Sequence, residues 1–318
     1  KSASQLLLNL IFSPNTDDNG FSTEDLEREK RKAIEHIKGE ISEKRIYAKK
    51  RLIEEMYETS AYGIPKCGTV EDVEAITETG LYNAWIQMLE TAFVRVQVVG
   101  SAVPAGLFED ITEKFSATHR KNITDCKISE PTERRNTVKR VTDNMDVTQG
   151  KLCLGFSAEM SGNDDTTLPL MVMTDIFGGG PYSRLFSNVR EKMSLCYYCS
   201  ASAVRQKGLI TVESGIETEN ALKAEKEILN QLEAVKKGEF SDFEFRSSIK
   251  SISDSLNSYN DSQNSIDLWY AIKINNDFVY SPEDIAEKLK NITREDVVNT
   301  AKGVTLNTVY KLLPEGAK

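Results

Sequence analysis

The feature that most constrains the fold is a run of three glycines, residues 178–180, between two apolar segments. Residues 168–177 predict a helix with Pro169 in its opening turn, where a missing N–H costs little. The glycines are expected to end this helix, because residues without Cβ can adopt positive φ. Pro181 then begins a second helix. Its apolar stripe at helical spacing consists of Tyr182, Leu185, Phe186 and Val189.

A strand follows the second helix. After Ser194 the hydrophobic period drops to two, which predicts a strand over residues 195–204. Arg190, near the end of the helix, and Tyr197, near the start of the strand, then meet at one turn. A guanidinium and a phenol can both donate to a carbonyl oxygen as it gains negative charge. The alternative is that Arg190 satisfies carbonyls at a helix C-terminus and Tyr197 is a half-buried strand aromatic.

This segment resembles the second-domain signature of the insulinase/pitrilysin family of inverzincin metallopeptidases, GGG-x-x-SRL-F…REK-x-x-L-x-Y. The matching residues are Gly178, Gly179, Gly180, Ser183, Arg184, Leu185, Phe186, Arg190, Glu191, Lys192, Leu195 and Tyr197. In that family an Arg and a Tyr seven residues apart hold the peptide near the scissile bond. The resemblance therefore implies catalytic positions for Arg190 and Tyr197. It also implies substrate binding by the three glycines with Ser183 and Arg184.

The composition excludes several partners. Forty Lys and Arg against 49 Asp and Glu give a net charge of -9, which argues against nucleic acid and anionic membrane surfaces. The longest apolar runs fall well short of the roughly 20 residues that span a bilayer. Five cysteines without a disulfide framework favour a reducing compartment, so a cytoplasmic location is expected. Cys196 and Cys199 form the one C-x-x-C. Three residues apart in a strand they are expected on opposite faces, which argues against metal or dithiol chemistry.

The first half predicts helices up to residue 60, with a helix cap at Ser22, and a strand over residues 93–100. It also resembles the insulinase family, in the later part of the first domain. The matching features are Phe12-x-Pro14, the helix around Glu29, Tyr62-Gly63…Gly68-Thr69 and Val98-Val99-Gly100. Because the chain starts at Lys1 within a helical pattern, we expect a fragment or a processed product.

The zinc motif of the family, H-x-x-E-H, is absent from this sequence, whose two histidines are His36 and His119. The resemblance places that motif before Lys1. The family's third zinc ligand is a glutamate seven residues after another glutamate; Glu29 matches the first, but the ligand position is His36. Because a ligand without partners binds no metal, no metal site is expected in this chain. Zinc is expected in a partner chain or in a missing N-terminal part.

The second half predicts one α+β domain. Residues 119–145 are polar and indicate a linker, with room for one β-segment, between residues 1–118, the later part of the first domain, and residues 146–318. A hairpin turning at residues 205–208 precedes a long helix closed by Gly238, whose expected inward residues are Leu222, Leu229, Leu232 and Val235. The resemblance implies an insulinase-like metallopeptidase fold. Such a fold has two related domains, the first truncated here, with twisted antiparallel-rich sheets and helices on one side.

Three functions follow from these patterns. The first is the non-zinc, substrate-binding subunit of a two-chain peptidase, most similar to a bacterial group of such subunits. It would supply Arg190 and Tyr197 to the zinc site of a homologous zinc-bearing partner, as a heterodimer or within a homodimer, for hydrolysis of a peptide substrate. The second is a zinc endopeptidase whose H-x-x-E-H half is absent from this sequence. The third is a non-catalytic scaffold subunit. Whether the chain itself takes part in catalysis is left open by the sequence, and alone it is expected to be inactive.

Overall fold

The computed structural model describes residues 2–17, 20–103, 105–124, 131–159, 164–272 and 279–316. The chain divides into two compact units. Unit 1 consists of Lys1–Gly39, Lys66–Ile128 and Asn260–Asp277, and unit 2 of Glu40–Pro65, Ser129–Tyr259 and Phe278–Lys318. The expected domain boundaries at 118 and 146 stay a prediction.

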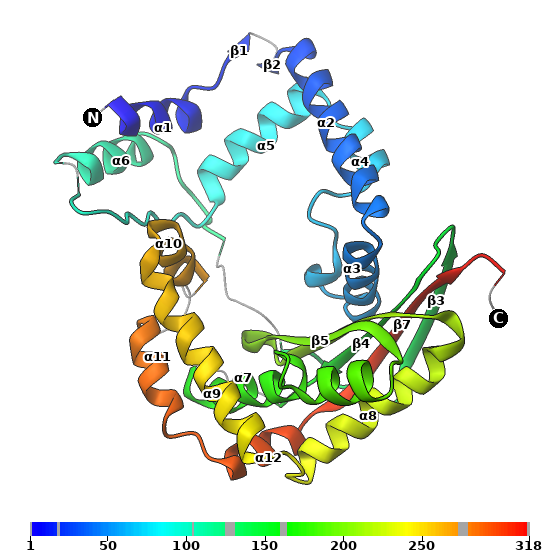
Figure 1. Ribbon diagram of the computed structural model, residues 1–318. Helices are drawn as coiled ribbons and strands as arrows, with labels where there is room; N and C mark the ends of the chain where they lie inside the picture. The colour runs from blue at the N-terminus through cyan, green and yellow to red at the C-terminus, as the bar shows by residue number, and fades with distance from the viewer. Residues whose placement is uncertain are drawn as a thin grey trace. The chain divides into compact units, whose positions relative to one another are not determined.

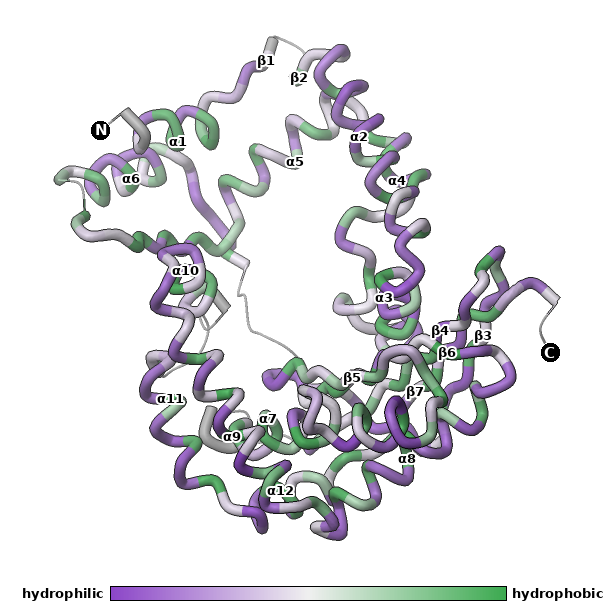
Figure 2. Tube along the Cα trace, in the orientation of Figure 1, coloured by the Kyte–Doolittle hydropathy of each residue, from purple (hydrophilic) through white to green (hydrophobic). Residues whose placement is uncertain are grey.

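Unit 1 is mainly helical (Figure 1). Its elements are α1 (Ser2–Phe12), a short hairpin of β1 (Thr16–Asp17) and β2 (Gly20–Phe21), α2 (Thr23–Ser42), α4 (Val70–Glu74), α5 (Glu78–Thr91), α6 (Leu107–Ser116) and α10 (Gln263–Ile272). Most residues of α2 are hydrophilic, as its tube in Figure 2 shows, and the helix buries Leu26 and Ile37. The Trp85 indole lies 5.4 Å from the Tyr82 ring and donates to the carbonyl of Ile11 at 3.0 Å.

The predicted strand over residues 93–100 is wrong. These residues have no strand pairing among the described part of the chain. The side chain of Gln97 instead donates to the Asp267 carboxylate at 2.7 Å and to its backbone carbonyl at 2.8 Å. Alternating apolar residues favour an extended backbone, but a strand also needs a neighbour that supplies backbone partners, and the pattern does not report on that neighbour.

Unit 2 is built on one five-stranded sheet in the order β3-β7-β4-β6-β5. The strands are β3 (Lys139–Met145), β4 (Gly150–Ser157), β5 (Cys196–Val204), β6 (Leu209–Ile216) and β7 (Thr305–Pro314). Only the β3–β7 pair among these is parallel. The predicted α+β class with an antiparallel-rich sheet is confirmed. The polar stretch 119–145, expected to have room for one β-segment, contains β3. β5, the strand of Tyr197, lies at one edge of the sheet.

Helices cover both faces of this sheet. On one face lie α7 (Asp164–Gly178), α8 (Ala221–Lys236), α9 (Asp242–Asn257) and α12 (Arg294–Lys302), as predicted (Figure 1). α3 (Lys44–Met56) lies on the other face and packs its apolar side against Cys153, Leu209, Tyr310 and Leu312. An added Cβ at Gly155 would lie 2.1 Å from the Met56 sulfur, so α3 packs directly over this glycine, and the flexible Met56 side chain would have to shift to admit a larger residue there. α11 (Pro282–Leu289), a short helix of eight residues, also belongs to this unit.

A buried carboxylate also ties α3 to the sheet. Glu213 of β6 is 8% exposed and accepts from Arg45 Nε at 3.0 Å and Lys49 Nζ at 2.7 Å. Burial alone would raise the pKa of Glu213, but the hydrogen bonds from Lys49 and Arg45, together with their positive charges, outweigh burial and lower it. The carboxylate is therefore charged and paired at neutral pH.

Local end signals set several helix boundaries as predicted. Ser241 caps α9 in a reciprocal box with Glu244, and Thr293 caps α12 in the same way with Asp296. Gly238, with φ of 76°, follows the end of α8. The predicted inward position of Leu222 is wrong, since this side chain is 72% exposed. The buried apolar face of α8 consists of Ala221, Ala224, Ile228, Leu232, Ala234 and Val235.

Candidate functional site

The glycine run is followed by a π-helix, η2 (Leu185–Lys192), in place of an ordinary α-helix. The Met193 N–H donates to the Asn188 carbonyl, five residues back, at 3.1 Å. Ser194 then takes φ of 50°, a left-handed conformation that costs a non-glycine residue about 1–2 kcal/mol. The chain reverses there and enters β5. π-Helical segments and strained turns of this kind concentrate at functional sites.

A β-bulge aims Tyr197. In the β5–β6 ladder Cys196 pairs with Ile216 and Tyr198 pairs with Gly215, so Tyr197 is the extra residue. Its side chain is 54% exposed, whereas Cys196 before it is buried. The predicted turn therefore exists, and a bulge that the sequence analysis did not foresee directs the phenol outward.

Arg190 and Tyr197 line the same pocket, which has a volume of about 390 Å³. The pocket is bounded by Arg190, Glu191, Ser194, Leu195, Cys196, Tyr197, Glu217 and Asn220, all from unit 2. The Arg190 guanidinium lies 4.6 Å from the centre of the Phe186 ring, and its Nε lies 3.5 Å from Glu191 Oε1. These contacts hold the cation beside the pocket while leaving its side chain 40% exposed. A guanidinium and a phenol at one opening can together hold a carbonyl oxygen.

Glu217 is a pocket residue that the sequence analysis missed. The Tyr197 hydroxyl donates to Glu217 Oε1. This hydrogen bond, with the negative charge of the carboxylate, raises the pKa of Tyr197, so the phenol stays a neutral donor at neutral pH. Glu217 directly follows Ile216, the residue that pairs with Cys196. The predicted hairpin register could have placed Glu217 beside Tyr197.

At the three glycines, neighbouring atoms lie too close to leave space for a side chain. None of Gly178, Gly179 and Gly180 has positive φ, so the expectation of positive φ is wrong. A Cβ at Gly178 would lie 2.6 Å from the Ala201 nitrogen of β5, and one at Gly179 would lie 2.1 Å from Asp175 Oδ2. The missing side chain at Gly178 lets α7 approach the backbone of the strand that carries Tyr197.

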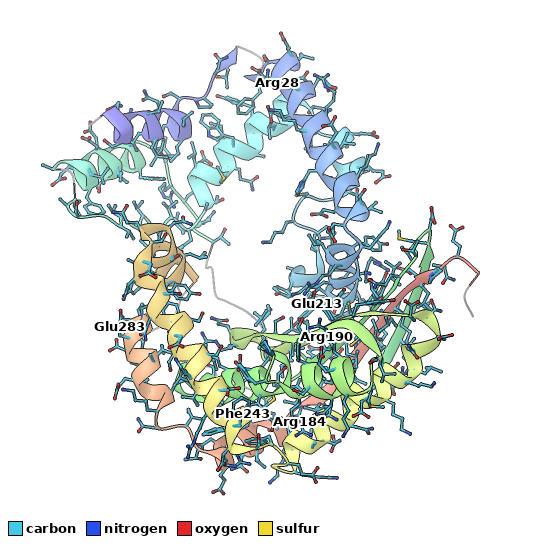
Figure 3. All side chains as sticks on the ribbon, viewed as in Figure 1. Arg28, Arg184, Arg190, Glu213, Phe243 and Glu283 are labelled. Carbon is cyan, nitrogen blue, oxygen red and sulfur yellow. The ribbon has the colours of Figure 1, made fainter. Side chains whose placement is uncertain are left out.

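Ser183 and Arg184 lie away from the pocket lining. Ser183 is 1% exposed. The Arg184 guanidinium donates to Gln231 Oε1 of α8 at 2.9 Å and to the Glu239 carbonyl at 2.5 Å. Figure 3 shows Arg184 toward α9, near the labelled Phe243, and Arg190 toward the strands. These contacts tie η2 to the helical layer. Substrate binding by Ser183, Arg184 and the glycines stays a prediction.

Metal ligands do not cluster within the described residues, where no group of three or more His, Cys, Asp and Glu side chains could hold an ion. Glu29, which matches the first glutamate of the family's third-ligand pattern, lies on the surface and pairs with Lys32 at 2.8 Å and Arg28 at 3.3 Å. His36 is exposed. Among the described helices, none has the length and apolar content needed to cross a membrane.

Comparison with known proteins identifies the family. The family model described as the peptidase M16 inactive domain matches residues 87–252, just over half of the chain. The chain belongs to the M16, or insulinase, peptidase family and is a homologue of its inactive domains.

Two curated relatives come from Bacillus subtilis. The chain is 30% identical over 317 residues to the "Probable inactive metalloprotease YmfF", an alignment that covers 97% of this chain and 72% of the relative. It is 26% identical over 216 residues to the "Uncharacterized zinc protease YmxG", covering 67% of this chain and 50% of that protein.

Solved structures share the fold. A conserved protein from Enterococcus faecalis has a TM-score of 0.88 at 23% identity, covering 99% of this chain and 74% of that one. A peptidase M16 inactive domain from Pseudomonas fluorescens has a TM-score of 0.75 at 18% identity, covering 99% of this chain and 76% of that one. The predicted insulinase-like fold is confirmed.

Proposed function

We propose that this chain is the non-zinc subunit of a two-chain bacterial M16 peptidase located in the cytoplasm. In this proposal Arg190 and Tyr197 hold the carbonyl of a peptide that is hydrolysed at the zinc site of a homologous partner. The observation that carries the proposal is that both side chains, supplied by η2 and β5, line one pocket.

The two groups have the required chemistry. Arg190 is a permanent cation, and Tyr197 is a neutral donor whose pKa is raised by Glu217. A peptide carbonyl that gains negative charge competes with Glu217 for the phenolic hydrogen, and the nearby guanidinium favours the developing oxyanion. The zinc site, which supplies hydroxide, belongs to the partner in this proposal.

The chain is similar both to a protein named as inactive and to one named as a zinc protease, which supports an active site shared between two homologous chains. One relative in Bacillus subtilis is named a probable inactive metalloprotease and another a zinc protease. A pair of homologous chains, one with the metal and one with the donors, would complete one active site between them.

The test mixes the purified chain with a homologous zinc-bearing M16 subunit and follows cleavage of a fluorogenic unfolded peptide. Arg190→Ala and Tyr197→Phe are each expected to lower turnover about a hundredfold, as removal of a donor to an oxyanion does. Lys192→Ala is the matched control, because this exposed side chain belongs to the same π-helix but not to the pocket lining. Association of the two chains, measured by sedimentation, is expected to be unchanged.

The same experiment separates the alternatives. If all three variants associate with the zinc subunit and leave turnover unchanged, the chain acts as a scaffold and the proposal is wrong. A chain in the structure of complex III from Candida albicans shares the fold, with a TM-score of 0.72 at 12% identity. This similarity to part of a larger assembly is the reason for testing the scaffold alternative. Turnover by the zinc subunit alone, at the rate of the mixture, would equally contradict a shared site.

A further inference from the structure

The bulge that aims Tyr197 also changes the relation between two cysteines. On β6, Ile216 and Ser214 are two residues apart and therefore share one face of the sheet. Their partners on β5 are Cys196 and Cys199. Opposed residues of an antiparallel pair point to the same face, so the two cysteines also share one face. The expectation of opposite faces is wrong, because the extra residue at Tyr197 reverses the alternation.

The register also fixes the distance to be bridged. Three regular strand rises would separate the two Cα atoms by roughly 10 Å, whereas the two rises of the facing β6 residues correspond to roughly 7 Å. Disulfides usually join Cα atoms about 4.4–6.8 Å apart. Closing a bond between Cys196 and Cys199 therefore needs a contraction of the bulge of under about 1 Å.

The two sulfurs already interact. Both cysteines are free and buried. Cys199 donates a hydrogen bond to Cys196, which lowers the pKa of Cys196 against the opposing effect of burial, and the Arg190 charge acts in the same direction as the hydrogen bond. The same hydrogen bond and burial raise the pKa of Cys199. Cys196 is 9% exposed and lines the Arg190–Tyr197 pocket, so a small oxidant has a route to its sulfur.

We propose that Cys196 and Cys199 form an oxidisable dithiol, whose disulfide tightens the bulge and changes how Tyr197 is presented to the pocket. The oxidant is a small peroxide, and the site is reduced again by thiol reductants. The dithiol chemistry is independent of the proposed function; only its effect on peptide handling depends on that function.

The reaction balances with hydrogen peroxide. The Cys196 thiolate attacks one oxygen, an S–O bond forms, the O–O bond breaks, and the leaving hydroxide takes up a proton to become water. Cys199 loses its proton and attacks the Cys196 sulfur, so an S–S bond forms while the S–O bond breaks and a second water leaves. The two thiols lose two electrons and two protons, and the peroxide gains them. Exchange with a dithiol reductant reverses the change.

Other cysteines provide internal comparisons. Cys153 lies on the opposite face of the sheet beneath α3, and burial raises its pKa to about 12. It should react with peroxide at least tenfold more slowly than Cys196, because the thiolate is the reactive form. Cys67 is exposed, and the proposal assigns it no second thiol with which to form a disulfide. Its oxidation therefore reports that the peroxide has reached the protein.

The test treats the reduced, purified chain with hydrogen peroxide, blocks remaining thiols and maps the products by mass spectrometry. We expect a disulfide between Cys196 and Cys199 that disappears on treatment with dithiothreitol. Cys153 is expected to carry the blocking reagent, which shows that its thiol was not oxidised. In Cys199→Ser, Cys196 is expected to be trapped by a sulfenic-acid reagent without any link. Phenylarsine oxide, which needs two adjacent thiols, should bind wild-type chain and not Cys196→Ser.

The nuclear magnetic resonance signal of Tyr197 tests the coupling to the pocket, because a disulfide that served only a structural role would leave this signal unchanged. The Cζ resonance of labelled Tyr197, assigned with Tyr197→Phe, is expected to shift on oxidation of the wild type and to stay in place in Cys199→Ser. Two results would overturn the proposal if circular dichroism shows that the treated wild-type chain is still folded. One is that both thiols remain available for alkylation, and the other is that a single thiol is overoxidised without a disulfide forming. A link that forms without moving the Tyr197 resonance would overturn the coupling to the pocket. Neither readout requires a zinc subunit, so failure of the proposed function leaves both intact.

Discussion

Gly178→Ala should destabilise unit 2, although alanine is ordinarily the better helix residue. The added Cβ would lie 2.6 Å from the Ala201 nitrogen and 2.7 Å from its Cβ, about 0.8 Å short of the 3.4 Å where ordinary contact begins. The obstacle is the β5 backbone, which cannot rotate aside as a side chain can. Overpacking of a close-packed interior costs about 1–3 kcal/mol, and a rigid backbone obstacle belongs at the upper end.

The gain from alanine offsets only part of that cost. Replacing glycine in a helix gains up to about 1 kcal/mol, which leaves a net loss of about 2 kcal/mol. The matched control is Gly39→Ala in α2, where an added Cβ meets nothing within 4 Å. That substitution should stabilise by about 0.5–1 kcal/mol. The same chemical change is thus expected to have opposite signs at two helical positions.

Urea unfolding measures both effects. The two tryptophans, Trp85 and Trp269, belong to unit 1, so fluorescence reports on that unit, whereas far-ultraviolet circular dichroism also includes unit 2. With a slope of about 2 kcal/mol/M, Gly178→Ala should lower the midpoint by circular dichroism by about 1 M urea. An equal or higher midpoint for Gly178→Ala, alongside the expected rise for Gly39→Ala, would refute the close approach of α7 and β5.

Two further predictions concern neighbouring features. Glu213→Gln should cost about 1 kcal/mol at pH 7, a low figure for a charged hydrogen bond because Arg45 and Lys49 are half exposed. Since the pKa of Glu213 is lowered on folding, its contribution is present above the unfolded pKa of about 4.3 and is lost as pH falls through the folded value. The urea midpoints of wild type and variant should therefore converge as pH falls from about 4.3 through the folded pKa, and a gap that stays constant over this range would contradict the ion pair. Ser194→Gly should stabilise by up to about 1 kcal/mol and Ser194→Val destabilise by about 1–2 kcal/mol, because Ser194 has positive φ. Thermal unfolding checks this order, and equal melting temperatures would exclude the strained turn.

Features encoded within a few residues could be read from the sequence. The caps at Ser241 and Thr293 need only a hydroxyl and a carboxylate three positions later, and both boxes are present. The hairpin of β5 and β6 follows from alternation on both sides of a turn, and Gly208 takes φ of 59° there. The meeting of Arg190 and Tyr197 at one pocket follows from the same local order of elements.

Features that depend on a distant partner could not be read in this way. The bulge at Tyr197 is a property of two strands in register, and the face of each cysteine changes with it. The glycine run looked like a source of positive φ, but the left-handed residue is Ser194, and Gly178 is required by the approach of Ala201. Leu222 lies at the start of α8, where a phase error of one residue exchanges the inside for the outside.

The packing of α3 on the sheet has a consequence for the order of assembly during translation. This helix ends at Met56, whereas the last strand that it covers, β7, begins at Thr305. At about 5–20 residues per second, the ribosome completes β7 some tens of seconds after the helix has emerged. Throughout that interval Leu52 and Met56 lack their final neighbours Tyr310 and Leu312, so the apolar side of α3 is left incompletely covered until the last strand has been synthesised.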